Sequence, residues 1–124
     1  MILTLDIGGT EIKYATIDSK IHTQDKMPTS VISSEETFYD TIEKIYSQFD
    51  DIEGIAISMP GIINSKTGYI ELVSVFPYLS KTNVKEGLEN RLHIPVSVEN
   101  DAKSAALCEA KIGGAKDVSD AVIL

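Results

Sequence analysis

The sequence predicts one α/β domain with a mixed sheet, in which three antiparallel strands come first and helices flank the sheet. Three observations predict this fold class. The 124 residues suffice for one core but not for two. Residues 2–28 alternate β-rich runs with tight turns. Beyond them, stretches with helical periodicity alternate with short apolar runs, which is typical of parallel strands joined by helices.

The first predicted hairpin carries the residues around which the chain is organised. An apolar run over residues 2–7, interrupted by Asp6, leads into Gly8, Gly9 and Thr10, and a second β-rich run follows. Adjacent glycines can adopt backbone angles closed to other residues and let a ligand approach the main chain. Their N–H groups and the Thr10 hydroxyl could face a phosphate, while Asp6 holds its magnesium ion through water. An ordinary hairpin turn is the commoner explanation of such a stretch.

The next elements are predicted to be scaffold. Residues 12–17 and 21–27 form the second and third strands, and the third lies near an edge because it is poor in apolar residues. Ser33, followed three residues later by Glu36, is a capping-box signature. It predicts a helix that runs to about Phe49, with one apolar stripe.

A central strand is predicted over residues 52–59, which are nearly continuously apolar after their second residue. Such a run is typical of a strand covered on both faces. Pro60 and Gly61 end it abruptly. Ligands of open α/β sheets lie beyond the carboxyl ends of the strands, so Gly61 is a second place where backbone could approach a substrate. A simple turn explains Gly61 equally well.

The following segment is predicted to alternate short elements. Residues 69–75 form a strand or extended segment that ends near Ser74, and residues 76–82 form a loop. A short helix begins at Asn83, and residues 95–98 form a second buried strand.

Asn100 and Asp101 are predicted to lie where this buried strand gives way to a helix that continues to a glycine cap near residue 114. A last strand begins near residue 117. A carboxylate at such a boundary most often caps its helix. It can instead act as a general base on a ligand hydroxyl that the Asn100 amide helps to hold. If the glycine turn binds phosphates, this hydroxyl would attack the terminal phosphoryl group.

Composition weighs against several other classes of protein. The net charge is −8 and there is no basic run, which weighs against nucleic acid or an anionic membrane as partner. The single cysteine, Cys108, allows no internal disulfide, and His22 and His93 lack metal-ligand spacing. No basic leader or membrane-length apolar run is present, so a cytoplasmic protein is expected.

Taken together, three motifs resemble the ROK family of repressors, open reading frames and sugar kinases. They are Asp6-Ile-Gly-Gly-Thr10, Gly54-Ile-Ala-Ile-Ser-Met-Pro-Gly61 and Pro95-Val-Ser-Val-Glu-Asn-Asp-Ala102, the last running into Ala106-Leu-Cys-Glu109. Their order and spacing cover nearly the whole chain. The resemblance implies the N-terminal lobe of a ribonuclease H-like, actin-like ATPase. It also implies ATP-dependent phosphorylation of a sugar hydroxyl, usually the one on carbon 6 of a hexose.

The resemblance also implies roles for single residues. Asp101 would be the general base, and Gly61, Ser74, Asn100 and Asp101 would contact the sugar. The magnesium ion and the ATP phosphates would be served by Asp6, Gly8, Gly9 and Thr10. Members of the family commonly dimerise.

The family's C-terminal lobe, with its zinc site and most adenosine contacts, is not expected in this chain. Residues 1–117 would form the N-terminal lobe, and residues 118–124 would begin the strand that leads into the other lobe. The chain would then be an excised lobe or a truncated product, and alone it would be inactive because half of the cleft is missing.

Two departures from the family pattern concern the sugar. The family's Asn-Leu-Pro-Gly-Trp-like segment reads Tyr78-Leu-Ser-Lys-Thr82 here. Ile62 replaces the arginine of N-acetylmannosamine kinases, which disfavours that substrate. Glucose, N-acetylglucosamine, fructose and β-glucosides all remain candidate substrates.

Two other functions also stay open. The first is a non-catalytic sugar-sensing domain of a ROK-type regulator, although Met1 leads straight into a strand where such regulators carry a DNA-binding module. The second is a degenerate lobe used only for assembly, against which the presence of Asp6 and Asp101 is a weak argument.

Overall fold

The computed structural model describes residues 1–101 of the chain. The predicted helix that contains Cys108, the predicted last strand and the boundary between residues 117 and 118 lie outside the described residues. In the described part, no helix is long and apolar enough to cross a membrane.

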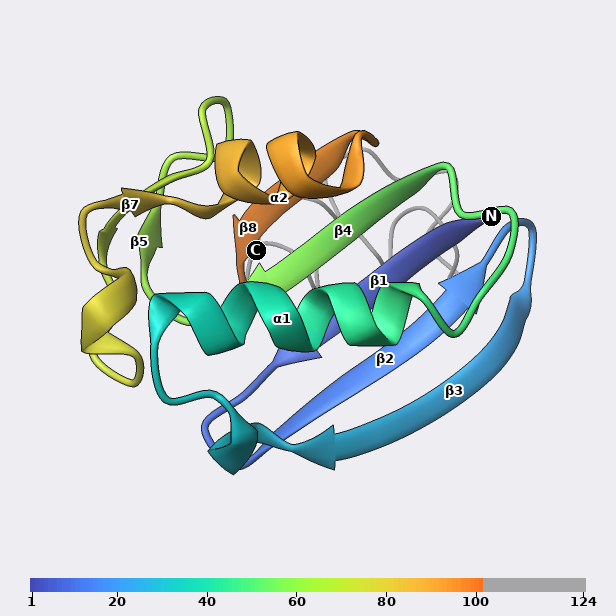
Figure 1. Cartoon of the computed structure of the whole chain (residues 1–124), viewed down its shortest axis with the longest axis horizontal. Helices are drawn as coiled ribbons and strands as arrows, with labels where there is room; N and C mark the ends of the chain where they lie inside the picture. Colours follow the sequence, from blue (N-terminus) through green and yellow to red (C-terminus); the bar gives the residue numbers. More distant parts are fainter. Residues whose placement is uncertain (102–124) are drawn as a thin grey trace, which may run out of the picture.

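A five-stranded mixed sheet forms the body of the domain, with the strand order β3-β2-β1-β4-β8 (Figure 1). The strands are β1 (Ile2–Ile7), β2 (Glu11–Ile17), β3 (Ile21–Pro28), β4 (Gly54–Met59) and β8 (Val96–Asn100). β1, β2 and β3 pair antiparallel, while β4 pairs parallel with both β1 and β8. The predicted antiparallel start, the parallel pair and the edge position of the third strand are therefore confirmed.

The remaining elements are shorter. They are η1 (Thr29–Val31), α1 (Glu35–Tyr46), β5 (Ile62–Ile63), β6 (Tyr69–Leu72), η2 (Pro77–Leu79), β7 (Thr82–Asn83) and α2 (Val84–Leu92). β5, β6 and β7 form a separate three-stranded antiparallel sheet. α1 and α2 lie on one face of the large sheet (Figure 1).

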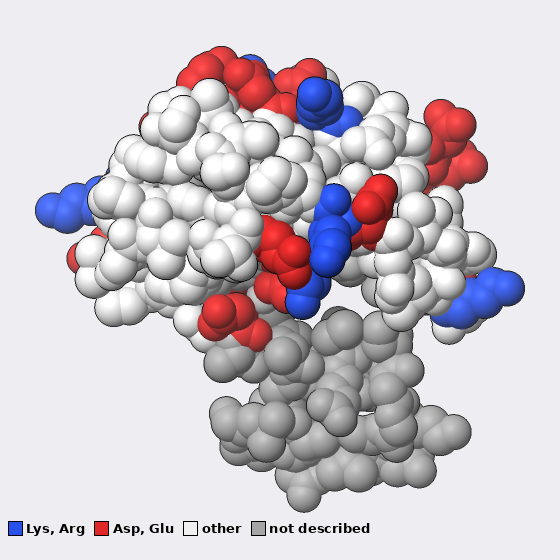
Figure 2. Space-filling model, turned by 90° about the horizontal axis from the view of Figure 1, so that it is seen from below, with Lys and Arg blue, Asp and Glu red and all other residues white. Residues whose placement is uncertain are grey.

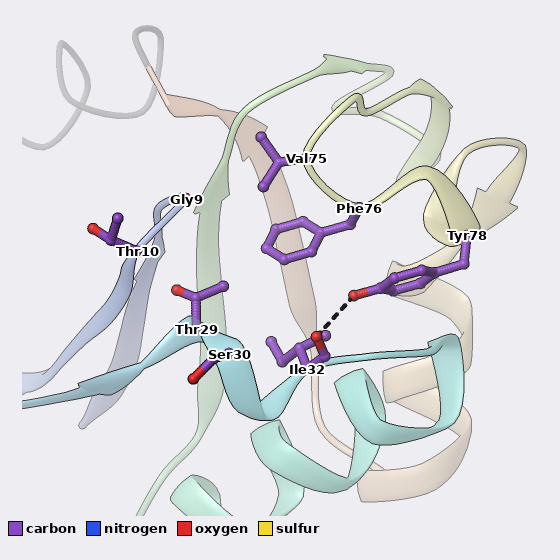
Figure 3. Close-up of a pocket in the computed structure, with 8 residues that line it drawn as sticks. All are labelled: Gly9, Thr10, Thr29, Ser30, Ile32, Val75, Phe76 and Tyr78. Atoms are coloured by element: carbon purple, nitrogen blue, oxygen red, sulfur yellow. Dashed lines mark hydrogen bonds between the residues drawn. The ribbon is translucent and has the colours of Figure 1, made fainter.

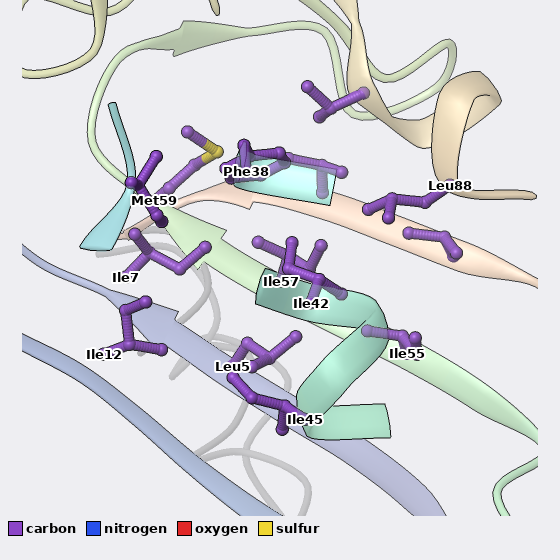
Figure 4. Packing of buried hydrophobic residues seen from close by; sticks show 14 of the residues in the cluster. Leu5, Ile7, Ile12, Phe38, Ile42, Ile45, Ile55, Ile57, Met59 and Leu88 are labelled. Atoms are coloured by element: carbon purple, nitrogen blue, oxygen red, sulfur yellow. The ribbon is translucent and has the colours of Figure 1, made fainter. Parts of the chain in front are cut away.

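The core lies between this face and the two helices (Figure 4). Alternate residues of β1 and β4, such as Leu5 and Ile57, are almost fully buried against Ile42 and Ile45 of α1. This alternation is the two-residue period of a strand meeting the apolar stripe of a helix. On the opposite face of β4, Ser58 is half-buried.

The start of α1 differs from the prediction by one residue. Ser34, not Ser33, is the N-cap, and its hydroxyl accepts the Thr37 N–H at 3.1 Å. The Thr37 hydroxyl in turn accepts the Ser34 N–H at 2.8 Å, which is the reciprocal bond expected of Glu36. The helix also ends at Tyr46, before the predicted end at Phe49.

The segment after β4 holds short elements that the sequence pattern does not predict. β6 ends at Leu72, before the predicted end near Ser74. It ends there because the Val73 N–H donates to the Ser80 hydroxyl at 3.0 Å and so has a side-chain partner in place of a strand partner. The loop expected after it contains η2, and the two-residue strands β5 and β7 flank β6.

α2 begins as predicted, with Asn83 as the N-cap, whose side chain accepts the Glu86 N–H at 2.9 Å. Arg91 near its end joins α2 to α1 by ion pairs to Glu36, Asp40 and Glu43 at 3.3, 3.0 and 3.2 Å. The two helices are thereby held beside each other over the core.

Glu89 of α2 links this helix to the start of β8, and Glu89→Gln is expected to reduce stability in a pH-dependent way. One carboxylate oxygen accepts the Val96 N–H at 2.9 Å and the Lys85 ammonium at 2.9 Å. These two contacts hold the pKa of Glu89 below its usual value of 4.5. A lowered folded-state pKa stabilises the fold above the unfolded-state pKa, and this stabilisation is lost as the pH falls through the folded-state pKa.

Urea denaturation at several pH values measures this effect. We expect Glu89→Gln to lower the free energy of unfolding at pH 7 by up to about 1 kcal/mol, since the carboxylate is partly exposed. The difference from the wild type should shrink as the pH falls below 4.5 and through the lowered folded-state pKa of Glu89. Glu71→Gln, at an exposed position on β6, is the matched control. An equal loss at pH 7 and at pH 3 would contradict the assigned role of the charge.

Candidate functional site

The predicted motifs meet at one edge of the large sheet. β1, β4 and β8 run parallel, so their carboxyl ends lie together. In the strand register, Asp6 lies beside Ser58, which lies beside Glu99. Two strand spacings therefore separate Asp6 from the end of β8, which is roughly 10 Å between backbones. Asp101 follows β8 directly, with helical backbone and an exposed side chain.

Asn100 and Gly61, both predicted to contact the sugar, are joined by a hydrogen bond. The Asn100 side-chain amide donates to the Gly61 carbonyl oxygen at 2.8 Å. Gly61 has a φ of 125°, and a Cβ built there would lie 2.6 Å from the Leu72 carbonyl oxygen. The turn after β4 therefore needs a glycine for reasons of backbone packing, and it is tied to the residue that precedes Asp101.

The glycine turn between β1 and β2 differs in part from the expectation. Neither Gly8 nor Gly9 has a positive φ, so this turn does not use the left-handed backbone that glycine permits. The Gly8 N–H donates to the Glu11 carbonyl oxygen at 3.0 Å and closes the turn. A Cβ built at Gly9 would have no neighbour within 4 Å. Open space beside the backbone at Gly9 is thus the feature that allows a ligand to approach.

Thr29 lies outside this turn and holds it by two hydrogen bonds, and no motif in the sequence points to it. Its hydroxyl donates to the Gly8 carbonyl oxygen at 2.9 Å, and its N–H donates to the Thr10 carbonyl oxygen at 3.0 Å. The side chain is buried. The pairing of the strands could have pointed to Thr29. Because β3 pairs antiparallel with β2, the end of β3 must lie beside the turn between β1 and β2.

A pocket of about 470 Å³ lies between the glycine turn and the loop that follows β6 (Figure 3). Its lining has a polar side, Gly9, Thr10, Thr29 and Ser30, and an apolar side, Ile32, Val75, Phe76 and Tyr78. The Tyr78 hydroxyl donates to the Ile32 carbonyl oxygen at 3.2 Å, which joins η2 to the segment before α1. Burial raises the pKa of Tyr78, so this hydroxyl keeps its proton at neutral pH.

Ser74, the remaining predicted sugar contact, is exposed and directly precedes Val75 of the pocket. Ser74 itself is not among the residues that line the pocket. Tyr78, which begins the segment that departs from the family pattern, lines the apolar side.

Asp6 is exposed and points away from the core, since Leu5 and Ile7 on either side of it are buried. Among residues 1–101, no group of three or more acidic, histidine or cysteine side chains could hold a metal ion. The residues present fit an ion that keeps most of its water and takes other ligands from a phosphate, which is the preference of Mg²⁺.

Charged side chains are interspersed on the face drawn in Figure 2. Basic and acidic side chains lie beside one another at its centre, and the described residues form no basic patch on this face. Lys13 and Lys26 each lie within 4 Å of the Glu11 carboxylate.

Comparison with known proteins places these features in a family. A family model described as "ROK family" matches residues 2–124. A β-glucoside kinase of Listeria innocua is 32% identical over 124 residues, which cover 99% of this chain and 42% of the kinase. The chain therefore spans less than half the length of this relative.

Solved structures share the fold. The ROK family glucokinase from Streptomyces griseus, in complex with glucose and AMPPNP, matches with a TM-score of 0.77 and 28% identity, over 90% of this chain and 37% of the glucokinase. A ROK family transcriptional regulator, a homologue of the E. coli MLC protein, matches with a TM-score of 0.80 over 94% of this chain and 32% of the regulator. At 22% identity, the regulator shows the fold alone. The expected fold class, the N-terminal lobe of the ribonuclease H-like, actin-like fold, is confirmed.

Proposed function

The chain belongs to the ROK family, and from this premise we propose that it is the N-terminal lobe of an ATP-dependent sugar kinase. The complete protein would transfer the γ-phosphoryl group of ATP to a sugar hydroxyl, namely O6 of a hexose, hexosamine or β-glucoside. One observation carries the proposal: the glycine turn, Gly61 and Asp101 lie at one carboxyl edge of parallel strands, where open α/β sheets bind ligands.

Asp101 is the general base in this proposal. Its exposed carboxylate stands at the end of β8, on the sheet edge that carries the glycine turn. It takes the proton of the sugar hydroxyl as the hydroxyl oxygen forms its bond to the γ-phosphorus and the bond to the β–γ bridging oxygen breaks. ADP is the leaving group.

The sugar is held by Asn100, Gly61 and Ser74. Because the Asn100 amide donates a hydrogen bond to the Gly61 carbonyl oxygen, these two sugar contacts are held beside each other. The apolar side of the pocket beside Ser74 suits a ligand with an apolar face, and its polar side supplies a few hydrogen-bonding groups, which is usual for small-molecule sites.

The phosphates of ATP lie against Gly8, Gly9 and Thr10. In the described part of the chain, no hydrogen bond engages the N–H groups of Gly9 and Thr10, so both can donate to an anion. Asp6 holds water molecules of a Mg²⁺ ion, which supplies charge neutralisation at the phosphates when bound.

Several parts of the proposal concern the complete protein. The C-terminal lobe closes the cleft and supplies the adenosine contacts and the family zinc site, so the 124-residue chain alone would be inactive. The division at residues 117 and 118, a homodimer, a cytoplasmic location and the lack of nucleic-acid or membrane partners are also predictions of this proposal.

The test is ADP release by the complete protein, with magnesium-ATP and a panel of glucose, N-acetylglucosamine, fructose and β-glucosides. Strong turnover with one sugar is expected, and it would name the substrate. Sugar binding without turnover for any sugar would instead favour the sensing domain of a regulator, the second function that this family fold serves.

A further inference from the structure

The conformation of the glycine turn must be fixed by contacts with other parts of the chain. Gly8 and Gly9 have no side chains, and glycine loses more conformational freedom on folding than any other residue. Donors that bind a phosphate are effective only when they already point at it. We propose that Thr29 is the residue that orients this turn for the ATP phosphates. The proposal rests on the kinase function proposed above and makes Thr29 a positioning residue, since it acts through the turn.

The hydroxyl hydrogen bond of Thr29 determines which way the Gly9 N–H of the turn points, and its N–H hydrogen bond fixes the Thr10 carbonyl at the end of the turn. Its hydroxyl holds the Gly8 carbonyl at 2.9 Å, and its N–H holds the Thr10 carbonyl at 3.0 Å. In a planar trans peptide, the C=O and the following N–H point in opposite directions. Holding the Gly8 carbonyl toward Thr29 therefore directs the Gly9 N–H away from Thr29.

Thr29 can do this because it is itself held on both sides. It follows the last pair of the β2–β3 register, in which Glu11 lies opposite Pro28. Its carbonyl oxygen accepts the Ile32 N–H at 2.9 Å and so closes η1. Its side chain is 4% exposed, and it lies across from Gly9 and Thr10 in the pocket (Figure 3). The hydroxyl therefore has little freedom to leave the Gly8 carbonyl.

Substitution of Thr29 in the complete protein tests the proposal. Thr29→Val keeps the shape of the side chain and removes its donor, whereas Thr29→Ser keeps the donor. We expect Thr29→Val to raise the KM for magnesium-ATP, and the Kd for AMPPNP, by about 10-fold. The KM for the sugar should stay within about 2-fold of the wild type, and Thr29→Ser should restore nucleotide affinity to within about 3-fold.

Thr41→Val is the matched control. Thr41 is also buried, and its hydroxyl donates to the Thr37 carbonyl oxygen at 2.7 Å within α1. Its loss should lower the melting temperature about as much as Thr29→Val does, while nucleotide affinity stays unchanged. A merely structural Thr29 would behave in the same way as Thr41.

Two outcomes overturn the inference separately from the function. If wild-type protein binds AMPPNP and Thr29→Val binds it equally well, the positioning role is wrong and the kinase proposal stands. If Thr29→Val and Thr41→Val weaken nucleotide binding equally, the effect is general destabilisation and the role is again wrong. If the wild-type protein neither binds AMPPNP nor releases ADP with any sugar, both the positioning role of Thr29 and the kinase proposal are wrong.

Discussion

Asp101→Asn in the complete protein is expected to lower kcat by about 10³-fold while the protein still folds and binds its sugar. The asparagine side chain has almost the same size and can still accept a hydrogen bond at the helix start, so the structural role of the position survives. It cannot take a proton from the attacking hydroxyl. Steady-state ADP release gives kcat, and calorimetric titration with the sugar gives the Kd.

The size of the effect separates a general base from a helix cap. A cap lost at this position would lower stability by about 1 kcal/mol and leave the chemistry intact. Asp50→Asn, at a loop position after α1, is the control for a change of one surface carboxylate and should keep wild-type kcat. Turnover by Asp101→Asn within a few-fold of the wild type would rule out Asp101 as the base.

The main sheet was predictable because its signal is periodic and local. β1 alternates buried and exposed residues, and β4 is an apolar run ended by Pro60 and Gly61. β5 and β7 were not predictable, because a two-residue strand has no period to detect. The choice between Ser33 and Ser34 as the cap was also not decidable from sequence, since each has a suitable partner three residues later.

The site was predictable only in part, for a related reason. Motif order alone places Asp6 and Asp101 at one sheet edge, because parallel strands align their carboxyl ends. The contact of Asn100 with Gly61 spans 39 residues and depends on how β8 aligns with β4. Thr29 depends in the same way on the register of β3. Such contacts arise from tertiary pairing, which residue type and local spacing do not encode.

The backbone angles of the glycines show the same limit. Two adjacent glycines suggest a turn with positive φ, yet the described glycines with positive φ are Gly61 and Gly68. The β1–β2 turn is closed by the hydrogen bond from the Gly8 N–H to the Glu11 carbonyl oxygen, and none of its residues has a positive φ. Glycine is useful at Gly9 for the space it leaves, and at Gly61 for the angle it can adopt.

Gly61→Ala is expected to lower the free energy of unfolding by about 2–4 kcal/mol, since both strain and overlap act at this position. The backbone has a φ of 125°, which L-residues rarely adopt. The added Cβ would lie 2.6 Å from the Leu72 carbonyl oxygen and 3.1 Å from the Val73 Cβ. The first of these is a backbone atom that cannot rotate away, so the turn must move. Urea denaturation of both proteins measures the loss.

Gly9→Ala is the matched control, because it adds the same methyl group where there is open space and no positive φ. Its free energy of unfolding should stay within about 0.5 kcal/mol of the wild type. Its KM for magnesium-ATP should rise, because the methyl group occupies the space through which a phosphate approaches the backbone. Equal stability of Gly61→Ala and Gly9→Ala would show that the turn after β4 relaxes at little cost.

The consequence for the sugar follows from the bond between Gly61 and Asn100. A turn that moves to accommodate the added methyl group carries the carbonyl of this position away from the Asn100 amide, which donates to it at 2.8 Å. Asn100 directly precedes the proposed base, so a folded Gly61→Ala protein should lose sugar affinity as well as turnover. Gly9→Ala should keep its sugar affinity, since it changes only the nucleotide side. If Gly61→Ala weakens sugar binding and Gly9→Ala raises only the KM for magnesium-ATP, the turn after β4 is assigned to the sugar and the β1–β2 turn to the phosphates.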